Sequence, residues 1–123
     1  MSLAAHASRV SPQSEPAIDL VHLARQTMDD PALEIELLEM FERQSARLVE
    51  QLKQCDPADV VRRSEIAHKL RGSALALGAT RVASAARAFE DCCARGDSRS
   101  ERLIPALEAA VSEARAEIAG LTR

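Results

Sequence analysis

The stretch from Asp56 to Gly78, DPADVVRRSEIAHKLRGSALALG, has the pattern of one complete amphipathic helix. Asp56 followed by Pro57 supplies an N-cap side chain and a proline for the first turn, where its missing N–H costs nothing. Gly78 is the residue type that most often follows the end of a helix. Between these limits, apolar residues recur at helical spacing and predict one buried face: Val60, Ala67, Leu70, Ala74 and Leu77.

Two similar helices are predicted on either side of this stretch. Asp30 and Pro31 repeat the start pattern, and one apolar face then continues to about Gln54. After the glycine, Thr80 can cap a further helix that ends near Gly96. The predicted inward positions are Leu33, Leu37, Phe41, Leu48 and Leu52 in the earlier helix, and Val82, Ala85 or Ala86, Phe89, and Cys92 or Cys93 in the later one.

A last helix and a short first helix complete the pattern. Residues 97–100 form a polar turn, and Pro105 stands in the first turn of the helix that follows, where proline is tolerated. Its inward positions have almost heptad spacing: Leu103, Leu107, Val111, Ala114, Ile118 and Leu121. Near the N-terminus, spacings of three and four predict a short helix that ends near Asp29 and Asp30 and carries Ile18, Val21, Ala24 and Met28.

Four amphipathic helices joined by short loops predict an all-α fold. The expected architecture is an antiparallel up-down-up-down four-helix bundle with a short extra N-terminal helix. The 123 residues are enough for one domain of this kind. Serines and prolines without a sustained period predict a flexible leader over residues 1–16, which leaves residues 17–123 for the bundle.

Composition argues against several classes of partner. The 16 basic and 19 acidic residues give a net charge of -3 without a basic stripe, and aromatic residues are only 2%, so nucleic acid is not an expected partner. No apolar run approaches the roughly 20 residues that span a bilayer, and the N-terminus lacks a signal-peptide pattern. We therefore expect a cytoplasmic protein without a membrane partner. The charged outer faces of the helices favour a monomer.

The cysteines and histidines show no metal-ligand pattern. The three cysteines, Cys55, Cys92 and Cys93, are odd in number and are expected to be reduced packing residues. One of the adjacent pair is expected to be buried and the other partly exposed. A redox role is disfavoured, because a helix C-terminus opposes thiolate formation. No metal site is expected from the histidines, which lie on separate segments: His6, His22 and His68.

His68 does not fit the buried face of its helix. On a helical wheel it lies roughly 140° from the centre of the apolar stripe, so its side chain is expected to face solvent. A neutral imidazole offers a nitrogen lone pair as a nucleophile. Its neighbours on the outward sector are unusually apolar for an exposed surface and predict docking of a partner: Val61, Gly72, Leu75 and Ala76.

Three further residues suit a chemical role for His68. Gly72 stands one helical turn after it, at an interior site where glycine costs about 1 kcal/mol relative to alanine. Access to the imidazole is a natural explanation for a glycine there. Lys69 and Arg71 flank the histidine, so a phosphoryl group placed on the ring would find cations within side-chain reach.

The residues AHKLRGSA at positions 67–74, followed by Gly78-Ala79 and then Phe89-Glu90, closely resemble the signature of histidine phosphotransfer (HPt) domains. The match includes the histidine, both glycines and the serine of that signature at the right intervals, and the resemblance spans most of residues 18–121. Arg71 stands where the family usually has lysine. This substitution keeps the charge but replaces a compact ammonium with a planar guanidinium.

The resemblance implies a role for each matching residue. His68 is then the phosphorylated residue, Arg71 and Lys69 stabilise the phosphoryl group, and Gly72 leaves room for the partner. Ser73 is expected to assist by hydrogen bonding. The docking residues expected around His68 are Val61, Ser64, Glu65, Leu75 and Ala76.

The resemblance also implies the partners. The phosphoryl group would arrive from a receiver-domain aspartate or a histidine kinase, hybrid kinases included, and would leave for the aspartate of a response regulator. No glycine-rich phosphate loop of the GxxxxGKS type and no Mg²⁺-binding carboxylate cluster is present, so neither ATP binding nor autokinase activity is expected. The chain itself is expected to need no cofactor, with Mg²⁺ held by the receiver.

Two other interpretations stay open. A non-catalytic helical adaptor would bind a signalling partner through the His68 face without any chemistry. A dimerisation and transfer domain of a kinase-like protein would have a similar bundle, although the sequence contains no ATP-binding domain.

Overall fold

The computed structural model describes residues 16–122, and every regular element in that range is a helix. Residues 1–15 lie outside the described part, so the predicted leader is not tested. The elements in chain order are α2 (Leu20–Thr27), α3 (Pro31–Gln54), α4 (Val60–Leu77), α5 (Thr80–Ala94), the 3-10 helix η1 (Ser98–Leu103) and α6 (Ile104–Leu121).

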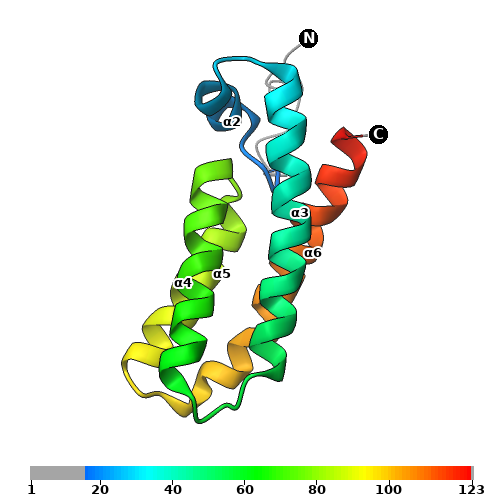
Figure 1. Cartoon of the computed structure of the whole chain (residues 1–123). Coiled ribbons are helices and arrows are strands. Elements are labelled where there is room, and N and C mark those ends of the chain that lie inside the picture. Colours follow the sequence, from blue (N-terminus) through cyan, green and yellow to red (C-terminus); the bar gives the residue numbers. More distant parts are fainter. Residues whose placement is uncertain (1–15, 123) are drawn as a thin grey trace.

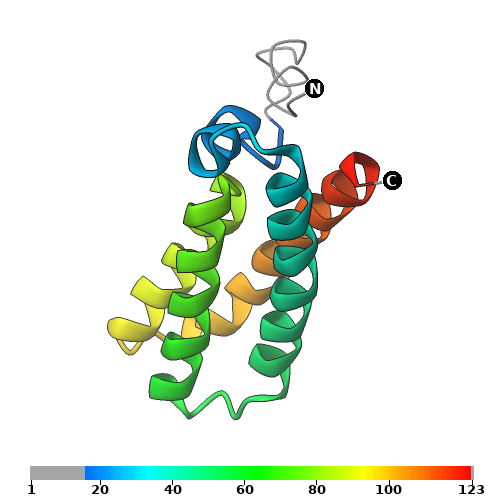
Figure 2. The ribbon, with the colours of Figure 1, turned by 45° about the horizontal axis from the view of Figure 1, so that its top comes forward.

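Helices α3 to α6 form an antiparallel up-down-up-down bundle, which confirms the predicted fold. Neighbours in the chain also pack against each other, and α6 closes the bundle against α3. Figures 1 and 2 show α3 and α6 on one side of the molecule and α4 and α5 on the other. The short α2 lies across one end and contacts both α3 and α4. Among the described residues, no helix is both long enough and apolar enough to cross a membrane.

One continuous core runs through the bundle. Small side chains on α4 and α5 let these two helices approach closely, since Ala67, Ala74 and Ala86 are all fully buried. Larger aliphatic and aromatic side chains fill the remaining space: Leu38, Phe41, Leu48, Leu52, Ile66, Leu70, Leu77, Val82, Phe89, Leu107, Val111 and Ile118. The predicted inward faces of α4, α5 and α6 supply most of this list.

Two predicted helix starts differ from the structure. Asp30 caps α3 through the amides of Ala32 and Leu33, as predicted. The start of α4 was placed too early, because the Asp56 side chain caps a local turn at Ala58 and Asp59 is the true N-cap. Thr80 is likewise the first residue of α5 and not its cap, since Ala79 occupies the cap position without a side-chain hydrogen bond.

Some predicted inward positions are wrong. Neighbouring residues in a helix point about 100° apart, so an apolar residue next to the buried one points out of the core. In the first turns of α3, Glu34 and Leu38 are fully buried, whereas Leu33 is exposed and Leu37 is only partly buried. Val60 is also exposed, because it is the first residue of its helix. In α2 the buried residues are Leu20, Leu23, Ala24 and Thr27, and the predicted Val21 and Met28 are exposed.

Both adjacent cysteines are buried, which corrects the expectation that one would be partly exposed. The reason is the segment after α5. It was predicted to be a polar turn over residues 97–100, but the chain there forms η1, which packs against α5. Cys92 is covered there, with its Sγ 3.7 Å from the backbone oxygen of Asp97.

Gly78, at the end of α4, packs against Asp19, the residue that precedes α2. Its φ of +83° lies in the left-handed region, and a Cβ at this position would lie 2.8 Å from the backbone oxygen of Asp19. The Asp19 amide donates to the Gly78 carbonyl at 2.7 Å. This close approach requires glycine and fixes α2 on the end of the bundle.

Candidate functional site

His68 lies in the middle of α4 with its ring directed outward, and 69% of its side chain is exposed. Ala67 and Leu70 beside it are fully buried, so the inward face of the helix is fixed and the histidine lies opposite it. The predicted exposure of His68 is therefore confirmed. The surrounding outward residues Val61 and Leu75 are also exposed, as predicted.

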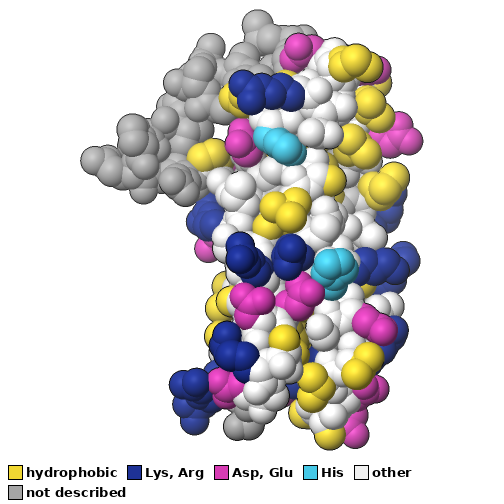
Figure 3. Space-filling view, turned by 90° about the vertical axis from the view of Figure 1, so that its left-hand side faces the viewer, with side chains coloured by type: hydrophobic (Ala, Val, Ile, Leu, Met, Phe, Trp, Pro, Cys, Tyr) yellow, Lys and Arg dark blue, Asp and Glu magenta, His cyan; other side chains and the backbone are white. Residues whose placement is uncertain are grey.

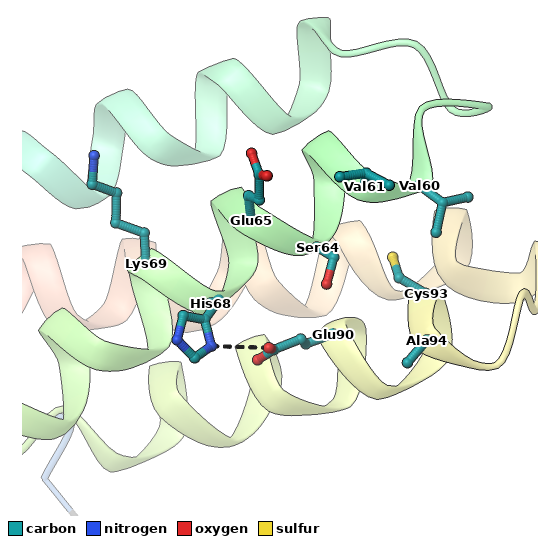
Figure 4. A pocket seen from close by; sticks show the side chains of 9 residues that line it. All are labelled: Val60, Val61, Ser64, Glu65, His68, Lys69, Glu90, Cys93 and Ala94. Carbon is teal, nitrogen blue, oxygen red and sulfur yellow. Dashed lines mark hydrogen bonds and ion pairs between the residues drawn. The ribbon is translucent and has the colours of Figure 1, made fainter.

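A carboxylate from the neighbouring helix contacts the ring. Glu90 Oε2 on α5 lies 2.9 Å from Nδ1 of His68 (Figure 4). Gly78 in the turn between the helices lies ten residues after His68 and twelve residues before Glu90. In an antiparallel pair of helices, residues at similar distances from the turn face each other, which explains the contact.

The other oxygen of Glu90 is held by Arg71. Nη1 of Arg71 donates to Oε1 of Glu90 at 3.1 Å, so the carboxylate bridges the imidazole and the guanidinium. Glu90 is the less exposed partner in both pairs, at 20% of its side chain. A carboxylate that accepts from two side chains has little rotational freedom, which restrains the ring that it contacts.

This arrangement favours one of the two tautomers of the ring. An ionised carboxylate only accepts hydrogen bonds, so the 2.9 Å contact favours the form of the ring in which Nδ1 carries the proton and donates to Glu90. In the neutral ring, Nε2 then carries the lone pair. Figure 4 shows this second nitrogen on the side of the ring turned away from Glu90. The contact with Glu90 thus favours the tautomer whose lone pair lies on the exposed side of the ring.

The other two residues assigned to a phosphoryl group, Lys69 and Ser73, are not directed toward the ring of His68. Lys69 is exposed, and its side chain extends away from the ring (Figure 4). The hydroxyl of Ser73 donates to Oε1 of Gln44 at 3.1 Å, so it links α4 to α3. The structure therefore brings Arg71 to the histidine through Glu90, and it shows no contact of His68 with Lys69 or Ser73.

A hollow of about 590 Å³ opens beside His68 toward the start of α4. Its wall contains three of the predicted docking residues, Val61, Ser64 and Glu65, and it also contains Lys69. We call it the first hollow. Its remaining wall was not predicted from the sequence, because it comes from the first residue of α4 and from α5 (Figure 4): Val60, Glu90, Cys93 and Ala94.

Cys93 is the thiol in that wall. Burial raises the pKa of its thiol, which leaves little thiolate near neutral pH. The thiol is thus poorly suited to react as a nucleophile.

A second, smaller hollow of about 250 Å³ lies on the other side of His68, toward the end of α4. It is lined by Arg71, Leu75, Thr80, Ala83, Ser84 and Arg87. Two further residues of the predicted outward sector, Gly72 and Ala76, are exposed but line neither hollow. Figure 3 shows this face of the molecule, where positively and negatively charged side chains gather across the middle and hydrophobic ones lie above and below them.

The fold and the site together define a helical bundle that presents an exposed histidine, His68, whose ring is held by a carboxylate of the neighbouring helix. The chain belongs to the Hpt domain family, because the family model described as Hpt domain matches residues 36–117. This family acts in histidine phosphotransfer in two-component signalling, and its members interact with receiver domains. Comparisons with curated proteins and with solved structures gave no match.

Proposed function

We propose that this protein relays a phosphoryl group through His68. It takes the group from a receiver-domain aspartate or from a histidine kinase and passes it to the aspartate of another receiver. The observation that supports this most directly is the 2.9 Å contact between His68 Nδ1 and Glu90, which leaves the exposed Nε2 with the lone pair.

The transfer step follows from that tautomer. The lone pair on Nε2 attacks the phosphorus of an aspartyl phosphate, and a new N–P bond forms as the P–O bond to the aspartate breaks. The leaving aspartate carboxylate takes the electron pair of that bond. The proton on Nδ1 stays where it is, so no proton has to move during the step.

Glu90 has a second effect on the same step. Attack through Nε2 with Nδ1 still protonated makes the ring cationic, and the Glu90 carboxylate lies beside that developing charge. The charge disappears again when the group leaves for the next aspartate. Glu90 is therefore a positioning residue that favours the phosphorylated ring electrostatically, and Arg71 holds it in place.

The proposal assigns the metal to the partner. Mg²⁺ and the carboxylates that hold it belong to the receiver, which leaves this chain to supply a positioned imidazole and a docking face. Arg71, which contacts the same carboxylate as His68, is the cation that we assign to the phosphoryl oxygens, with Lys69 and Ser73 in lesser roles. A cytoplasmic monomer without ATP-dependent kinase activity is part of the same proposal.

The test is phosphoryl transfer from a panel of receiver domains that carry a labelled aspartyl phosphate. We expect label on this protein that is lost in acid and survives in base, as a phosphoramidate does. Binding of a receiver without any label would contradict the relay and favour the adaptor, for which the two hollows around His68 would still serve as a docking face.

Glu90→Gln is expected to slow transfer to His68 about tenfold, because the amide keeps the shape of the side chain but loses its charge. Nitrogen-15 NMR of the ring provides a readout that a merely structural role would not move. The wild-type ring is expected to be mainly the tautomer with the proton on Nδ1, and the variant is expected to shift toward the other tautomer.

Glu108→Gln is a suitable control for this variant. Glu108 also accepts from a cation, Lys53, at 3.1 Å, but it lies on α6 away from the histidine. Equal transfer rates for Glu90→Gln and wild type, with an unchanged tautomer, would show that Glu90 does not position the ring.

Two substitutions at Gly72 are expected to affect the free energy of unfolding and the rate of phosphoryl transfer differently. A Cβ at this position meets no atom within 4 Å, so Gly72→Ala is expected to raise the free energy of unfolding by about 1 kcal/mol through helix propensity. Gly72→Gln has a similar propensity but places a long side chain one turn from His68, and we expect at least a tenfold slower transfer from a receiver.

Urea unfolding and transfer kinetics on the same two variants check this prediction. If Gly72→Gln transferred as fast as wild type, the space above this glycine would not be needed by the partner. If Gly72→Ala were destabilised, the local backbone would need glycine for a reason that the structure does not show.

A further inference from the structure

The two hollows beside His68 differ in charge. Two carboxylates, those of Glu65 and Glu90, line the first hollow together with Lys69. The second hollow is lined by two guanidinium groups, those of Arg71 and Arg87, and no carboxylate is among its lining residues. The face that surrounds the histidine is therefore electrically asymmetric along α4.

The two arginines of the second hollow have N–H donors available for a further acceptor. Arg71 contacts Glu90 through Nη1 at 3.1 Å, and a guanidinium has five N–H donors. Arg87 is 73% exposed, and its pair with Asp91 is long, at 3.9 Å. An exposed pair of that length contributes little, so Arg87 can exchange it for a better acceptor at small cost.

The partner in the proposed function has a chemistry that fits this hollow. A domain that makes and accepts an aspartyl phosphate with Mg²⁺ needs several oxygen ligands for the metal and therefore carries carboxylates around its reactive aspartate. When that aspartate lies over His68, acidic groups at its margin come to lie above the neighbouring turns of α4 and α5.

We propose that the second hollow receives an acidic side chain of the receiver domain, bound by Arg87 and Arg71, and that this contact fixes the orientation in which the receiver docks. The inference rests on the proposed function. In the opposite orientation, the same acidic group would face the first hollow, where the two carboxylates of Glu65 and Glu90 outweigh the one ammonium group of Lys69. Like charges repel there, so one orientation is selected.

Charge reversal at Arg87 tests the inference. Arg87→Glu is compared with Arg115→Glu, which lies on α6 and makes a similarly long pair, 3.8 Å, with Glu42. Each reversal changes the net charge equally and places two carboxylates near each other, so the two variants are matched. Circular dichroism confirms that each variant is folded.

Transfer is measured from the receiver domain that labels the wild-type protein fastest in the panel. Rates are divided by the rate of labelling with phosphoramidate, a small donor that needs no docking. We expect Arg87→Glu to lower kcat/KM about fivefold or more through a raised KM, and Arg87→Gln to have a smaller effect in the same direction. The loss should shrink as salt rises from about 25 to 250 mM.

The outcomes separate the two proposals. Equal kcat/KM values for Arg87→Glu and Arg115→Glu at low salt would overturn the docking inference and leave the relay intact. A loss confined to kcat, independent of salt, would also overturn it. A wild-type protein that takes label from phosphoramidate but from no receiver would instead contradict the proposed function itself.

Discussion

His68→Gln is expected to abolish transfer from a phosphorylated receiver, with a loss of at least about a thousandfold that reaches background. Glutamine is similar in size to histidine and can still hydrogen-bond to Glu90, but an amide nitrogen has no available lone pair. The wild-type side chain is 69% exposed, so the substitution removes little packing and the fold should be unchanged.

The measurement is acid-labile label after mixing with the receiver, together with thermal unfolding of both proteins. His22→Gln is the matched control, because it removes a histidine from α2, outside both hollows, and we expect it to retain label. Label that persisted on His68→Gln would place the acceptor on another residue and contradict the assignment of the site.

Phe89→Ala is expected to have the largest effect on stability and to lower the free energy of unfolding by about 3–5 kcal/mol. The ring is fully buried at the centre of the inward face of α5. It also supports a buried cation, because the guanidinium carbon of Arg63 lies 5.2 Å from the ring centroid. Removing the ring leaves a cavity and takes away one of the contacts of Arg63, whose other main partner is Glu101 at 2.6 Å.

Urea unfolding followed at 222 nm measures this loss. Met40→Ala is the comparison, because Met40 is an exposed apolar side chain and its removal is expected to change stability by less than about 0.5 kcal/mol. A loss below about 1 kcal/mol for Phe89→Ala would mean that the surrounding helices close over the space, and that α5 is less rigidly packed than its buried face implies.

The helices could be predicted from the sequence because their main determinants are local. The pattern of Asp30 followed by Pro31 and the left-handed Gly78 act on neighbouring backbone groups, and both were assigned correctly. The start of α4 was not, because Asp56 and Asp59 are both suitable caps. Only the path of the chain from α3 to α4 decides between them.

Buried side chains were predicted correctly where a helix has one continuous apolar face, and they were missed where the apolar residues lie on more than one side. Leu70, Phe89 and Ile118 lie on uninterrupted stripes and are buried as predicted. The first two turns of α3 have apolar residues on two sides, and packing against the other helices buries the side that carries Leu38. Buried Arg63 was not foreseen, because its acceptor Glu101 lies in η1, far along the chain.

The sequence by itself determined that His68 is exposed within an apolar sector and that Arg71 and Gly72 lie near it, because the helical period of about 100° per residue fixes relations within one helix. Only the tertiary structure decided that Glu90 contacts Nδ1 of His68, that Arg71 donates to the same carboxylate, and that the two hollows differ in charge. Those features depend on the axial offset and rotation of α5 against α4. Packing of side chains along the whole interface between the two helices sets the offset and the rotation, and the sequence of one helix alone does not specify them.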